Sequence, residues 1–281
     1  MRIVTDPALL RAEARERRAR GERIGLVPTM GYLHAGHTSL IALARPRCDW
    51  LVTSIYVNPL QFGPNEDLSR YPRDPDGDAQ KCAAAGTDLL FMPTDLYAPN
   101  HATRVRVDGL SAGQCGIARP THFEGVATVV ARLFGLVQPH LAIFGEKDYQ
   151  QLRVIQQMVD DLALDVVVEG GPLVRDGDGV ALSSRNAYLS TADRGRARTL
   201  HQALYAMRAA VDAGERDADA LLALGRARLD VDRLDYLDVV DGDTLAPLPT
   251  LPLPSPSGRP PRALLAAVVG RTRLLDNVAL G

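Results

Sequence analysis

Residues 24–37 constrain the fold of this chain more than any other stretch. The apolar run at residues 24–27 predicts a short buried strand, and Pro28 and Gly31 are expected to break it. The spaced leucine and isoleucine residues within 38–47 then predict a helix. A buried strand that turns directly into a helix is typical of an α/β fold.

Two histidines, His34 and His37, lie at this strand-to-helix turn. A helix N-terminus binds phosphate because its backbone N–H groups and the positive end of its dipole face the ligand. Imidazole N–H groups can add donors, and Gly36 has no Cβ to obstruct a nucleotide. We therefore expect a triphosphate at this turn.

The spacing of these residues is that of the HxGH signature of nucleotidyltransferases, which transfer an adenylyl group from ATP. Two other interpretations compete with it. A histidine pair three residues apart can bind a metal ion, although no third His or Cys lies at a recognisable spacing. A pattern of four residues can also arise by chance.

Further apolar runs predict strands that alternate with helices along the first part of the chain. The predicted strands are residues 50–57, 87–92, 141–144 and 165–168, and the predicted helices are residues 7–20, 78–85, 126–137 and 151–162. This order predicts a doubly wound parallel sheet. Ligands of such sheets bind outside the carboxyl ends of the strands.

Polar side chains follow two of these predicted strands. Asn58 and Gln61 come after residues 50–57, and their amides suit a small hydroxy acid, although a polar loop cap explains them as well. Lys147, Asp148 and Gln151 come after residues 141–144. There the lysine can neutralise phosphate, the aspartate can accept from ribose hydroxyls and the glutamine can hold a second substrate.

Two loops add candidate residues. Ser183, Ser184 and Arg185 place two hydroxyls and a guanidinium in a row, which can bind phosphate, although such residues are common in surface loops. Residues 63–78 are rich in proline and acidic residues, and a loop of this length indicates a lid. Its last residue, Asp78, is a candidate ligand of Mg²⁺ or an acid in the first turn of a helix.

A glycine pair and a proline at residues 170–172 indicate a domain boundary, so we predict one domain at residues 1–173 and another at residues 174–281. In the second domain, the predicted helices are residues 191–213 and 218–229, and the predicted strands are residues 234–240 and 263–269. The proline-rich residues 247–261 are expected to form a surface connector.

Composition narrows the class of protein. The chain has 281 residues, 46% of them hydrophobic, and a formal net charge of -2, so we expect a soluble globular protein that does not bind nucleic acid. The three cysteines are far apart and odd in number, which favours the reducing cytoplasm. No apolar run reaches the roughly 18 residues of a membrane span, and the P-loop and dinucleotide-binding signatures are absent.

Together, five separated motifs resemble those of the pantoate–beta-alanine ligase family, also called pantothenate synthetases, within the nucleotidyltransferase superfamily that has the HxGH motif. The motifs are residues 27–31 with 34–37, residues 57–63, residues 119–123, residues 144–151 and residues 183–186. Residues 235–237 and 272–277 also fit. The resemblance therefore spans nearly the whole chain in order.

The resemblance implies a Rossmann-like domain that binds the nucleotide and pantoate, followed by a smaller α+β lid domain that carries Ser-Ser-Arg-Asn. It implies a ligase that condenses (R)-pantoate with beta-alanine through an enzyme-bound pantoyl adenylate, and that releases AMP and pyrophosphate. It also implies Mg²⁺ with the ATP and a homodimer.

The site residues implied by the resemblance fall into groups by ligand. ATP is expected to contact Pro28, Met30, His34, Gly36, His37, Gly145, Lys147, Asp148, Val174, Leu182, Ser183, Ser184 and Arg185, of which the two histidines, the lysine, the serines and Arg185 are catalytic. Pantoate is expected to contact Asn58, Gln61, Gln151, Val129 and Val130. Tyr71 and Arg119 are expected on the beta-alanine side, and Asp78 is the candidate Mg²⁺ ligand. No residue stands out as general base for the amine of beta-alanine.

Two residues depart from the family pattern. Leu182 stands where methionine is usual, which conserves volume, and Tyr32 stands where alanine is common. Two alternative functions stay open. An adenylyltransferase acting on a phosphorylated acceptor would call for more Lys or Arg than the neutral Gln61 and Gln151. A catalytically silent nucleotide-binding module would show no pyrophosphate exchange.

Overall fold

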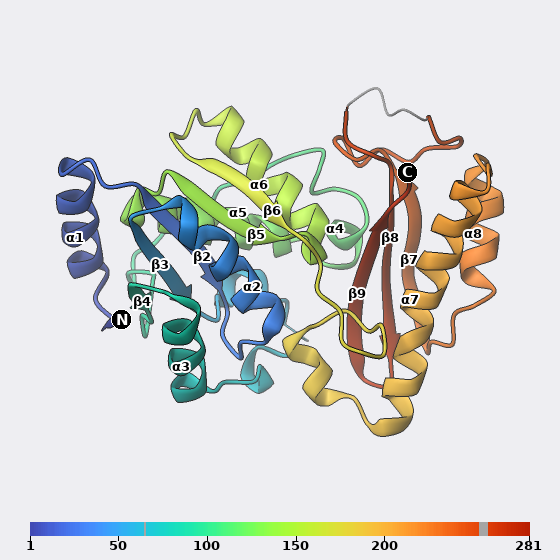
Figure 1. Cartoon of the computed structure of the whole chain (residues 1–281), viewed down its shortest axis with the longest axis horizontal. Coiled ribbons are helices and arrows are strands. Elements are labelled where there is room, and N and C mark those ends of the chain that lie inside the picture. The colour runs from blue at the N-terminus through green and yellow to red at the C-terminus, as the bar shows by residue number, and fades with distance from the viewer. Residues whose placement is uncertain (65, 253–257) are drawn as a thin grey trace. The chain divides into compact units, whose positions relative to one another are not determined.

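The structure is a computed structural model that describes residues 1–64, 66–252 and 258–281. The chain divides into two compact units (Figure 1). The first unit comprises Met1–Ser111, Arg119–Glu146 and Gln151–Pro172, and the second comprises Ala112–Ala118, Lys147–Gln150 and Leu173–Gly281. Asn65 of the predicted lid and residues 253–257 of the predicted connector lie outside the described residues.

Within the described residues of the first unit, six strands form one sheet, in the order β1-β4-β3-β2-β5-β6. Every neighbouring pair of these strands is parallel, which confirms the predicted doubly wound α/β fold. The strands are β1 (Arg2–Val4), β2 (Ile24–Thr29), β3 (Trp50–Ile55), β4 (Leu89–Phe91), β5 (Leu141–Gly145) and β6 (Val167–Gly171).

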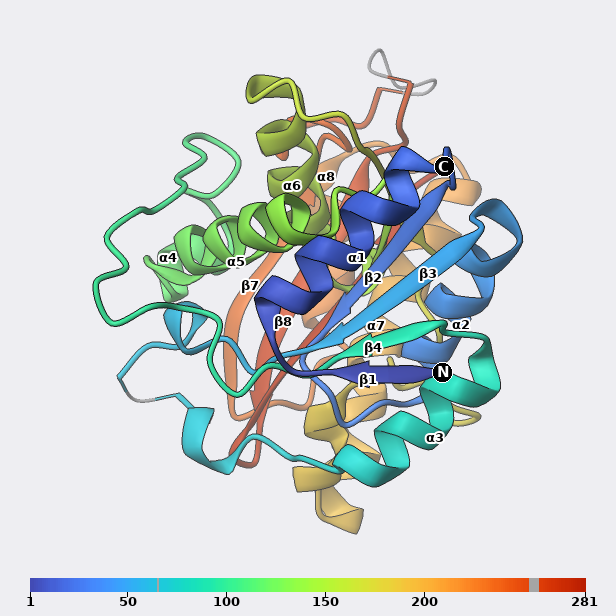
Figure 2. The same ribbon diagram turned by 90° about the vertical axis from the view of Figure 1, so that its left-hand side faces the viewer.

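Helices cover both faces of this sheet (Figure 2). Helices α2 (Ala35–Ala44) and α3 (Pro75–Ala85) lie on one face, and α1 (Pro7–Ala19), α5 (His122–Val137) and α6 (Tyr149–Asp161) lie on the other. The α2 face buries a cluster of apolar side chains that includes Val27, Ile41, Leu51, Leu90 and Ile143. Burial of this kind is the main favourable term in folding. No described helix is long and apolar enough to cross a membrane.

The start of α1 agrees with the sequence prediction, whereas α2, α3 and α5 begin earlier than predicted. Asp6 caps α1 by accepting a hydrogen bond from Ala8 N at 2.7 Å, with Pro7 in the first turn, as the sequence predicts. Asp74 caps α3 by accepting from Gly77 N at 3.1 Å, so this helix begins at Pro75 rather than at the predicted residue 78. Likewise, α2 and α5 begin three and four residues before the predicted positions 38 and 126.

Two predicted breaks lie inside strands. Pro28 pairs with Ser54 in β2, which is tolerated because the β2–β5 pairing ends earlier, at Leu26. Gly170 and Gly171, predicted as a boundary, belong to β6. A Cβ at Gly171 would come within 2.2 Å of the Leu40 side chain, so glycine here permits close packing of α2 on the strand.

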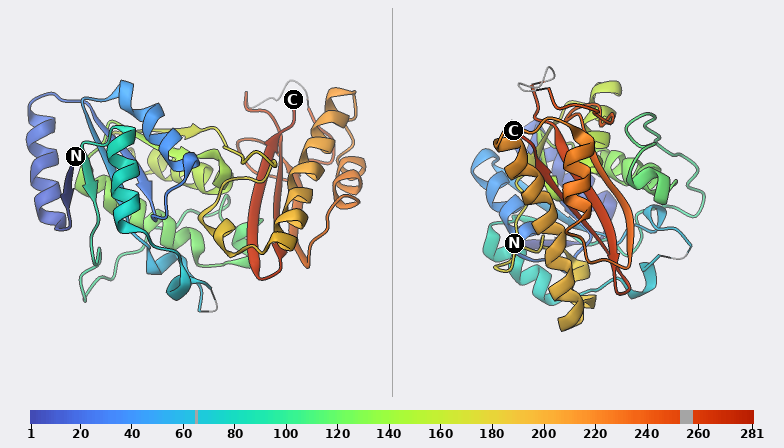
Figure 3. Two further views of the ribbon diagram at one scale, coloured as in Figure 1. Left: turned by 60° about the horizontal axis from the view of Figure 1, so that its bottom comes forward. Right: turned by 90° about the vertical axis from the view of Figure 1, so that its right-hand side faces the viewer.

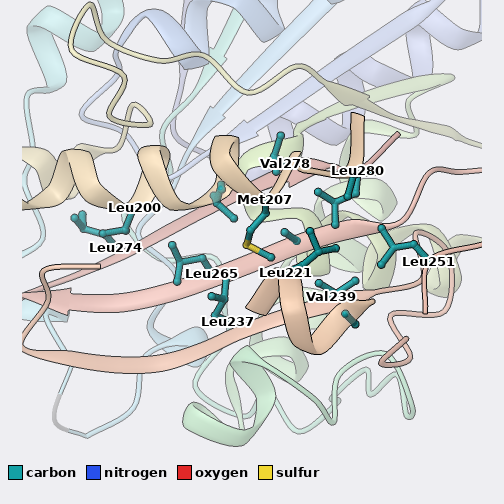
Figure 4. Close-up of a cluster of buried hydrophobic side chains, with 14 of the residues drawn as sticks. Leu200, Met207, Leu221, Leu237, Val239, Leu251, Leu265, Leu274, Val278 and Leu280 are labelled. Atoms are coloured by element: carbon teal, nitrogen blue, oxygen red, sulfur yellow. The ribbon is translucent and has the colours of Figure 1, made fainter. Parts of the chain in front are cut away.

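The second unit contains an antiparallel sheet of the order β7-β8-β9 within its described residues. Its strands are β7 (Arg233–Val240), β8 (Arg262–Val269) and β9 (Thr272–Ala279), and its helices are α4 (Cys115–Ala118), α7 (Thr191–Asp212) and α8 (Ala218–Arg226). Figure 3 shows α7 and α8 against the sheet. Met207 and Leu221 of these helices meet Leu237, Leu265 and Leu274 of the strands in a buried core (Figure 4).

Candidate active site

The strand order of the first unit reverses between β2 and β5. Chain segments after β2 continue to β3 and β4 on one side, whereas β5 is followed by β6 on the other. In doubly wound sheets, ligands bind outside the carboxyl ends of strands at such a switch point. The turn with the two histidines follows β2, and Gly145 ends β5.

The turn of residues 30–37, here called the histidine turn, is stabilised by hydrogen bonds to its own imidazole rings. His34 is the N-cap of α2 and accepts from Gly36 N at its Nδ1 (3.2 Å), while His37 Nδ1 accepts from His34 N (3.3 Å). The ring centroids are 4.1 Å apart. Because each Nδ1 is an acceptor, the proton of each neutral ring lies on Nε2, which makes Nε2 a donor. The predicted position of both histidines is confirmed.

Fewer backbone N–H groups of this turn are available to bind phosphate than the sequence suggested. Gly36 N donates to the His34 ring, and His37 N and Thr38 N donate to His34 O at 2.8 and 3.2 Å. These three first-turn donors are therefore already engaged within the helix. The imidazole Nε2–H groups add donors of the kind that suit phosphate oxygens.

Asp78 holds the turn that precedes His34. It is only 1% exposed, and its two carboxylate oxygens accept from Tyr32 N (2.7 Å) and Leu33 N (2.6 Å). Gly31 has a φ of 86°, and a Cβ there would come within 2.9 Å of Ile55 Cγ2. Tyr32 also has a positive φ, 51°, which is unusual for a bulky residue. The carboxylate thus stabilises a turn that needs external support.

This geometry favours a positioning role for Asp78 over a metal-binding role. Both oxygens already accept strong hydrogen bonds from backbone N–H groups. In the part of the chain that the structure describes, no group of three or more His, Cys, Asp or Glu side chains is arranged to hold a metal ion. Mg²⁺ binding at Asp78 stays a prediction.

Asn58 and Gln61 form a buried amide pair after β3. Asn58 is the N-cap of the short helix η2 (Pro59–Gln61), and its Nδ2 donates to Gln61 Oε1 at 3.0 Å. Tyr97 OH donates to Asn58 Oδ1 at 2.9 Å, and burial raises the pKa of this phenol, so it stays protonated. The amide of Gln61 is thereby oriented with Nε2 toward Met30, whose Sδ lies 3.1 Å away.

Close backbone packing joins this pair to α5. A Cβ at Gly125 would come within 2.3 Å of Leu60 O, so only glycine allows this approach of α5 to η2. Gly125 O also accepts from Asn58 Nδ2 at 3.0 Å. Val129 and Val130, the predicted apolar wall of the pantoate site, are buried one turn further along the same helix.

Arg119 is held by an ion pair that the sequence did not indicate. Its Nε donates to Glu66 Oε1 at 2.7 Å, and its Nη2 donates to the other oxygen of Glu66 and to Gln61 O. His122 contacts the Arg119 guanidinium and the Gln61 carbonyl. Its Nε2 lies 3.1 Å from Arg119 Nη1, and its Nδ1 lies 2.9 Å from Gln61 O. Burial alone would raise the pKa of Glu66, but the hydrogen bond and charge of Arg119 outweigh it and hold that pKa below its ordinary value.

Tyr71, the other residue predicted on the beta-alanine side, is buried. Its ring meets the ring of Phe62 edge-on, at a centroid distance of 6.0 Å. It lies near the end of the predicted lid, between the short helix η3 (Leu68–Arg70) and α3. Two residues of the predicted lid loop, Tyr71 and Glu66, thus pack against Phe62 and Arg119, respectively.

The second unit carries the remaining phosphate-binding candidates. Lys147 and Asp148 end the short helix η4 (Glu146–Asp148), with Nζ 3.6 Å from Oδ1. Ser183 caps the short helix η5 (Ser184–Tyr188) by accepting from Arg185 N at 3.3 Å, and Ser184 is buried. Just before them, Leu182 N donates to Val174 O at 3.0 Å, which brings these two predicted ATP contacts together.

The predicted site residues are divided between the two units. Those of the first unit are Pro28, Met30, His34, Gly36, His37, Asn58, Gln61, Tyr71, Asp78, Arg119, Val129, Val130, Gly145 and Gln151. Those of the second unit are Lys147, Asp148, Val174, Leu182, Ser183, Ser184 and Arg185. Sequence reasoning assigned no role to Glu66, Tyr97 or His122, which contact Arg119, Asn58 and Gln61 over 53, 39 and 61 positions of the chain. No local sequence signal marks such contacts.

Comparison with known proteins identifies the family. The family model described as pantoate-beta-alanine ligase matches residues 2–279. A pantothenate synthetase of Anaeromyxobacter dehalogenans is 52% identical, over 98% of this chain and 97% of that protein. A crystal structure of pantothenate synthetase from Thermus thermophilus has 47% identity and a TM-score of 0.93, covering 100% of this chain and 99% of that one.

A more distant structure also matches along the chain. It is a pantoate-beta-alanine ligase from Francisella tularensis complexed with beta-gamma ATP and beta-alanine, with 30% identity and a TM-score of 0.80. The match covers 99% of this chain and 97% of that one. Sequence and fold thus agree from end to end, and the chain belongs to the pantoate–beta-alanine ligase family.

Proposed function

We propose that this chain condenses (R)-pantoate with beta-alanine in two steps that share one adenylate intermediate. It is a ligase that forms a C–N bond, as its family membership states. In the first step a carboxylate oxygen of pantoate attacks the α-phosphorus of ATP, and pyrophosphate leaves. In the second step the nitrogen of beta-alanine attacks the acyl carbon, AMP leaves and the amine loses a proton.

The observation that carries this proposal is the contact between the amide pair and the histidine turn. Gln61 Nε2 lies 3.1 Å from the sulfur of Met30, four residues before His34. A neutral amide donor beside a nucleotide-binding turn suits a hydroxy acid that presents its carboxylate to the α-phosphate. A phosphorylated acceptor would call for cationic side chains at this position.

The first unit is proposed to bind pantoate and to orient the phosphates. Gln61 and Gln151 hold the pantoate, with Asn58 fixing the amide of Gln61 and the two valines of α5 as the apolar wall. The Nε2–H groups of His34 and His37 donate to phosphate oxygens. Negative charge grows on those oxygens in the transition state, so fixed donors stabilise the transition state more than the bound substrate.

The second unit is proposed to supply the positive charge. Lys147 and Arg185 neutralise the phosphates, and the hydroxyls of Ser183 and Ser184 donate to them. Val174 and Leu182 contact the adenine side, and Gly145 of the first unit acts with Asp148 on the nucleoside. The Francisella relative, whose structure is described as complexed with beta-gamma ATP and beta-alanine, supports the binding of these two substrates by this chain.

Mg²⁺ is proposed to enter with ATP, bound to its phosphate oxygens. When bound it neutralises phosphate charge. Because an acyl adenylate hydrolyses in water, the loop of residues 63–78 is proposed to cover the intermediate, with Tyr71 and Arg119 on the beta-alanine side. Proximity of the amine to the trapped adenylate accounts for the second step without a dedicated base. We also propose a cytoplasmic homodimer, from the cysteine usage and the family resemblance.

Product analysis tests the proposal directly. Purified enzyme with ATP, Mg²⁺, (R)-pantoate and beta-alanine should give pantothenate, AMP and pyrophosphate in equal amounts by mass spectrometry and phosphate assay. Production of ADP and phosphate instead would contradict adenylyl transfer. Activity with a phosphorylated acceptor but none with pantoate would favour the adenylyltransferase alternative.

Lys147→Ala tests the role of the proposed cation. Loss of a charge that stabilises the transition state should lower the adenylation rate by a factor on the order of 100 or more. Arg153→Ala, on the same helix α6 as Tyr149 and Gln150, is the matched control for loss of a nearby cation. Near-normal turnover of Lys147→Ala would remove this lysine from the mechanism.

A further inference from the structure

The C-terminal motif of residues 272–277 has no role in the proposed mechanism, yet Asp276 and Asn277 within it are buried polar residues. We propose that Asn277 is a positioning residue for Lys147, and that Asp276 and Asn277 of β9 together anchor the two phosphate-binding segments of the second unit. This inference rests on the proposed role of Lys147 in adenylation.

Asn277 links β9 to the main chain at Lys147. Its Nδ2 donates to Lys147 O at 3.0 Å, and its Oδ1 accepts from Arg262 Nη1 at 2.6 Å. Because a guanidinium can only donate, Arg262 dictates which end of the amide faces it. The NH₂ group must then face the carbonyl of Lys147. Asn277 is only 4% exposed. Water therefore cannot easily replace this contact, and its loss would leave buried polar groups without a hydrogen-bond partner.

The rest of the lysine segment is held by neighbouring contacts. Arg262 also stacks on Tyr149, with the guanidinium carbon 3.8 Å from the ring centroid. Tyr149 OH donates to Gly242 O at 2.7 Å. Gln150 accepts from Cys115 N at 3.0 Å and donates to Gly113 O at 2.9 Å. Lys147, Tyr149 and Gln150 are therefore each bound to other residues of the second unit.

Asp276 holds the other phosphate-binding segment. Arg175 donates to both of its carboxylate oxygens at 2.7 Å, and Asn277 N donates to Oδ1 at 2.7 Å. Burial alone would lower the pKa of Arg175, but the hydrogen bond and charge of Asp276 outweigh it and raise that pKa, so the guanidinium stays charged. Arg175 belongs to the segment that leads through Leu182 to Ser183 and Arg185.

Two adjacent residues of one strand thus fix both segments. Asn277 sets the position of the Lys147 main chain, and Asp276 sets the position of Arg175. The spacing between the lysine and the serine-arginine group is then determined by β9 rather than by either segment alone. A shift on the order of 1 Å in such a group can cost about 100-fold in rate.

Two variants separate the contacts of Asn277. Asn277→Asp keeps an acceptor for Arg262 but removes the donor to Lys147 O, and Asn277→Ser removes the whole amide without adding charge, because its shorter side chain places no donor at the position of Nδ2. Both should lower pantoate-dependent ATP–pyrophosphate exchange by about 10- to 100-fold. Thr272→Val, a buried polar site on the same strand, is the matched control and should leave exchange unchanged. Normal exchange in both Asn277 variants would overturn the proposal.

A double-mutant cycle with Lys147→Ala distinguishes positioning from general destabilisation. If Asn277 acts through the lysine, Asn277→Asp should lower exchange by less than about 3-fold in the Lys147→Ala background. The same fold loss in both backgrounds would show that Asn277 acts elsewhere. If Lys147→Ala alone exchanges normally, the proposed role of Lys147 fails instead, so the two failures are distinguishable.

Hydrogen–deuterium exchange provides a readout that does not depend on activity. In Asn277→Asp, a peptide spanning residues 145–151 should exchange faster than in the parent protein, whereas a peptide from β7 should not. Equal exchange of residues 145–151 in both proteins would contradict the anchoring role. If hydrogen–deuterium exchange is faster in all peptides of Asn277→Asp, which indicates unfolding, the same comparison is made with Asn277→Ser.

Discussion

At the scale of single residues, the site depends on which way a few buried amides and imidazoles point. The hydroxyl of Tyr97 donates to Asn58, Asn58 donates to Gln61, and the NH₂ group of Gln61 then faces Met30. Each bond fixes the donor and acceptor ends of the next group. Gln61 therefore presents a donor and not an acceptor on the side of Met30.

Gln61→Ala should weaken the use of pantoate while sparing ATP. Loss of a hydrogen bond to a charged group costs about 1.5–3 kcal/mol, so the KM for pantoate should rise by a factor on the order of 10 to 100. Calorimetry should give an unchanged Kd for ATP. Gln157→Ala is the control because the amide of Gln157 donates to Asp161 of its own helix. A variant that loses ATP affinity but keeps its KM for pantoate would reassign Gln61.

The Glu66–Arg119 pair makes stability depend on pH. Since Arg119 holds the pKa of Glu66 below its ordinary value of 4.5, the pair stabilises the folded state above that pH and less as the pH falls through the folded pKa. At pH 7 Glu66→Gln should lower the free energy of unfolding by about 1–3 kcal/mol. The difference from the parent protein should shrink below about pH 4.5.

Urea denaturation at several pH values measures this difference. Glu16→Gln, which replaces an exposed carboxylate on α1, is the control and should change stability little at any pH. A difference between Glu66→Gln and the parent that stays constant from neutral to acidic pH would show that the carboxylate's charge does not matter.

The sequence predicted the histidines and the amides but not their partners. His34 and His37 follow the end of β2, and Asn58 and Gln61 the end of β3, by three to eight residues, so local periodicity can locate them. Tyr97 and Glu66 lie in irregular segments, and their partners are far away in sequence. The role of Asp78 was also missed, because its bonds to Tyr32 N and Leu33 N span 46 and 45 residues.

At the scale of elements, the packing of α5 on η2 positions the amide pair. The two backbones meet at Gly125, whose Cα approaches Leu60 O too closely for any side chain. The N-terminal end of α5 also carries His122, which contacts Gln61 O. A change at this crossing should therefore alter both stability and the affinity for pantoate.

Gly125→Ala and Gly135→Ala should have opposite effects although both lie in α5. A methyl group at position 125 would be 2.3 Å from Leu60 O, so the variant should lose about 1–3 kcal/mol of stability and show a raised KM for pantoate. At position 135 nothing lies within 4 Å, and alanine should stabilise the helix by about 0.5–1 kcal/mol. Thermal unfolding and pantoate titrations check both. Equal effects would contradict the packing account.

Elements with clean periodicity were predictable, and elements determined by distant contacts were not. The apolar runs of β2, β3 and β5 and the caps of α1 follow from local rules. Strand β1 has only three residues, and β9 carries Arg273, Asp276 and Asn277 among its apolar positions. Their polar groups are satisfied by partners such as Cys115, Arg175 and Lys147, which no local pattern reveals.

At the scale of the whole molecule, the residues predicted to bind ATP are divided between the two units. The first unit offers imidazoles and amides, and the second offers a lysine, two serines and an arginine. The order of motifs along the chain was enough to predict the family. The assignment of Lys147–Gln150 to the second unit was not predictable, because the flanking residues Glu146 and Gln151 belong to the first.

The central claim is that pantoate is activated by adenylyl transfer before beta-alanine reacts. Isotope exchange between ATP and labelled pyrophosphate, measured without beta-alanine, tests it most directly. If pantoate is adenylylated first, exchange should be rapid, should require pantoate and should fall in Lys147→Ala. Exchange that is absent with pantoate, or equally fast without it, would contradict the account.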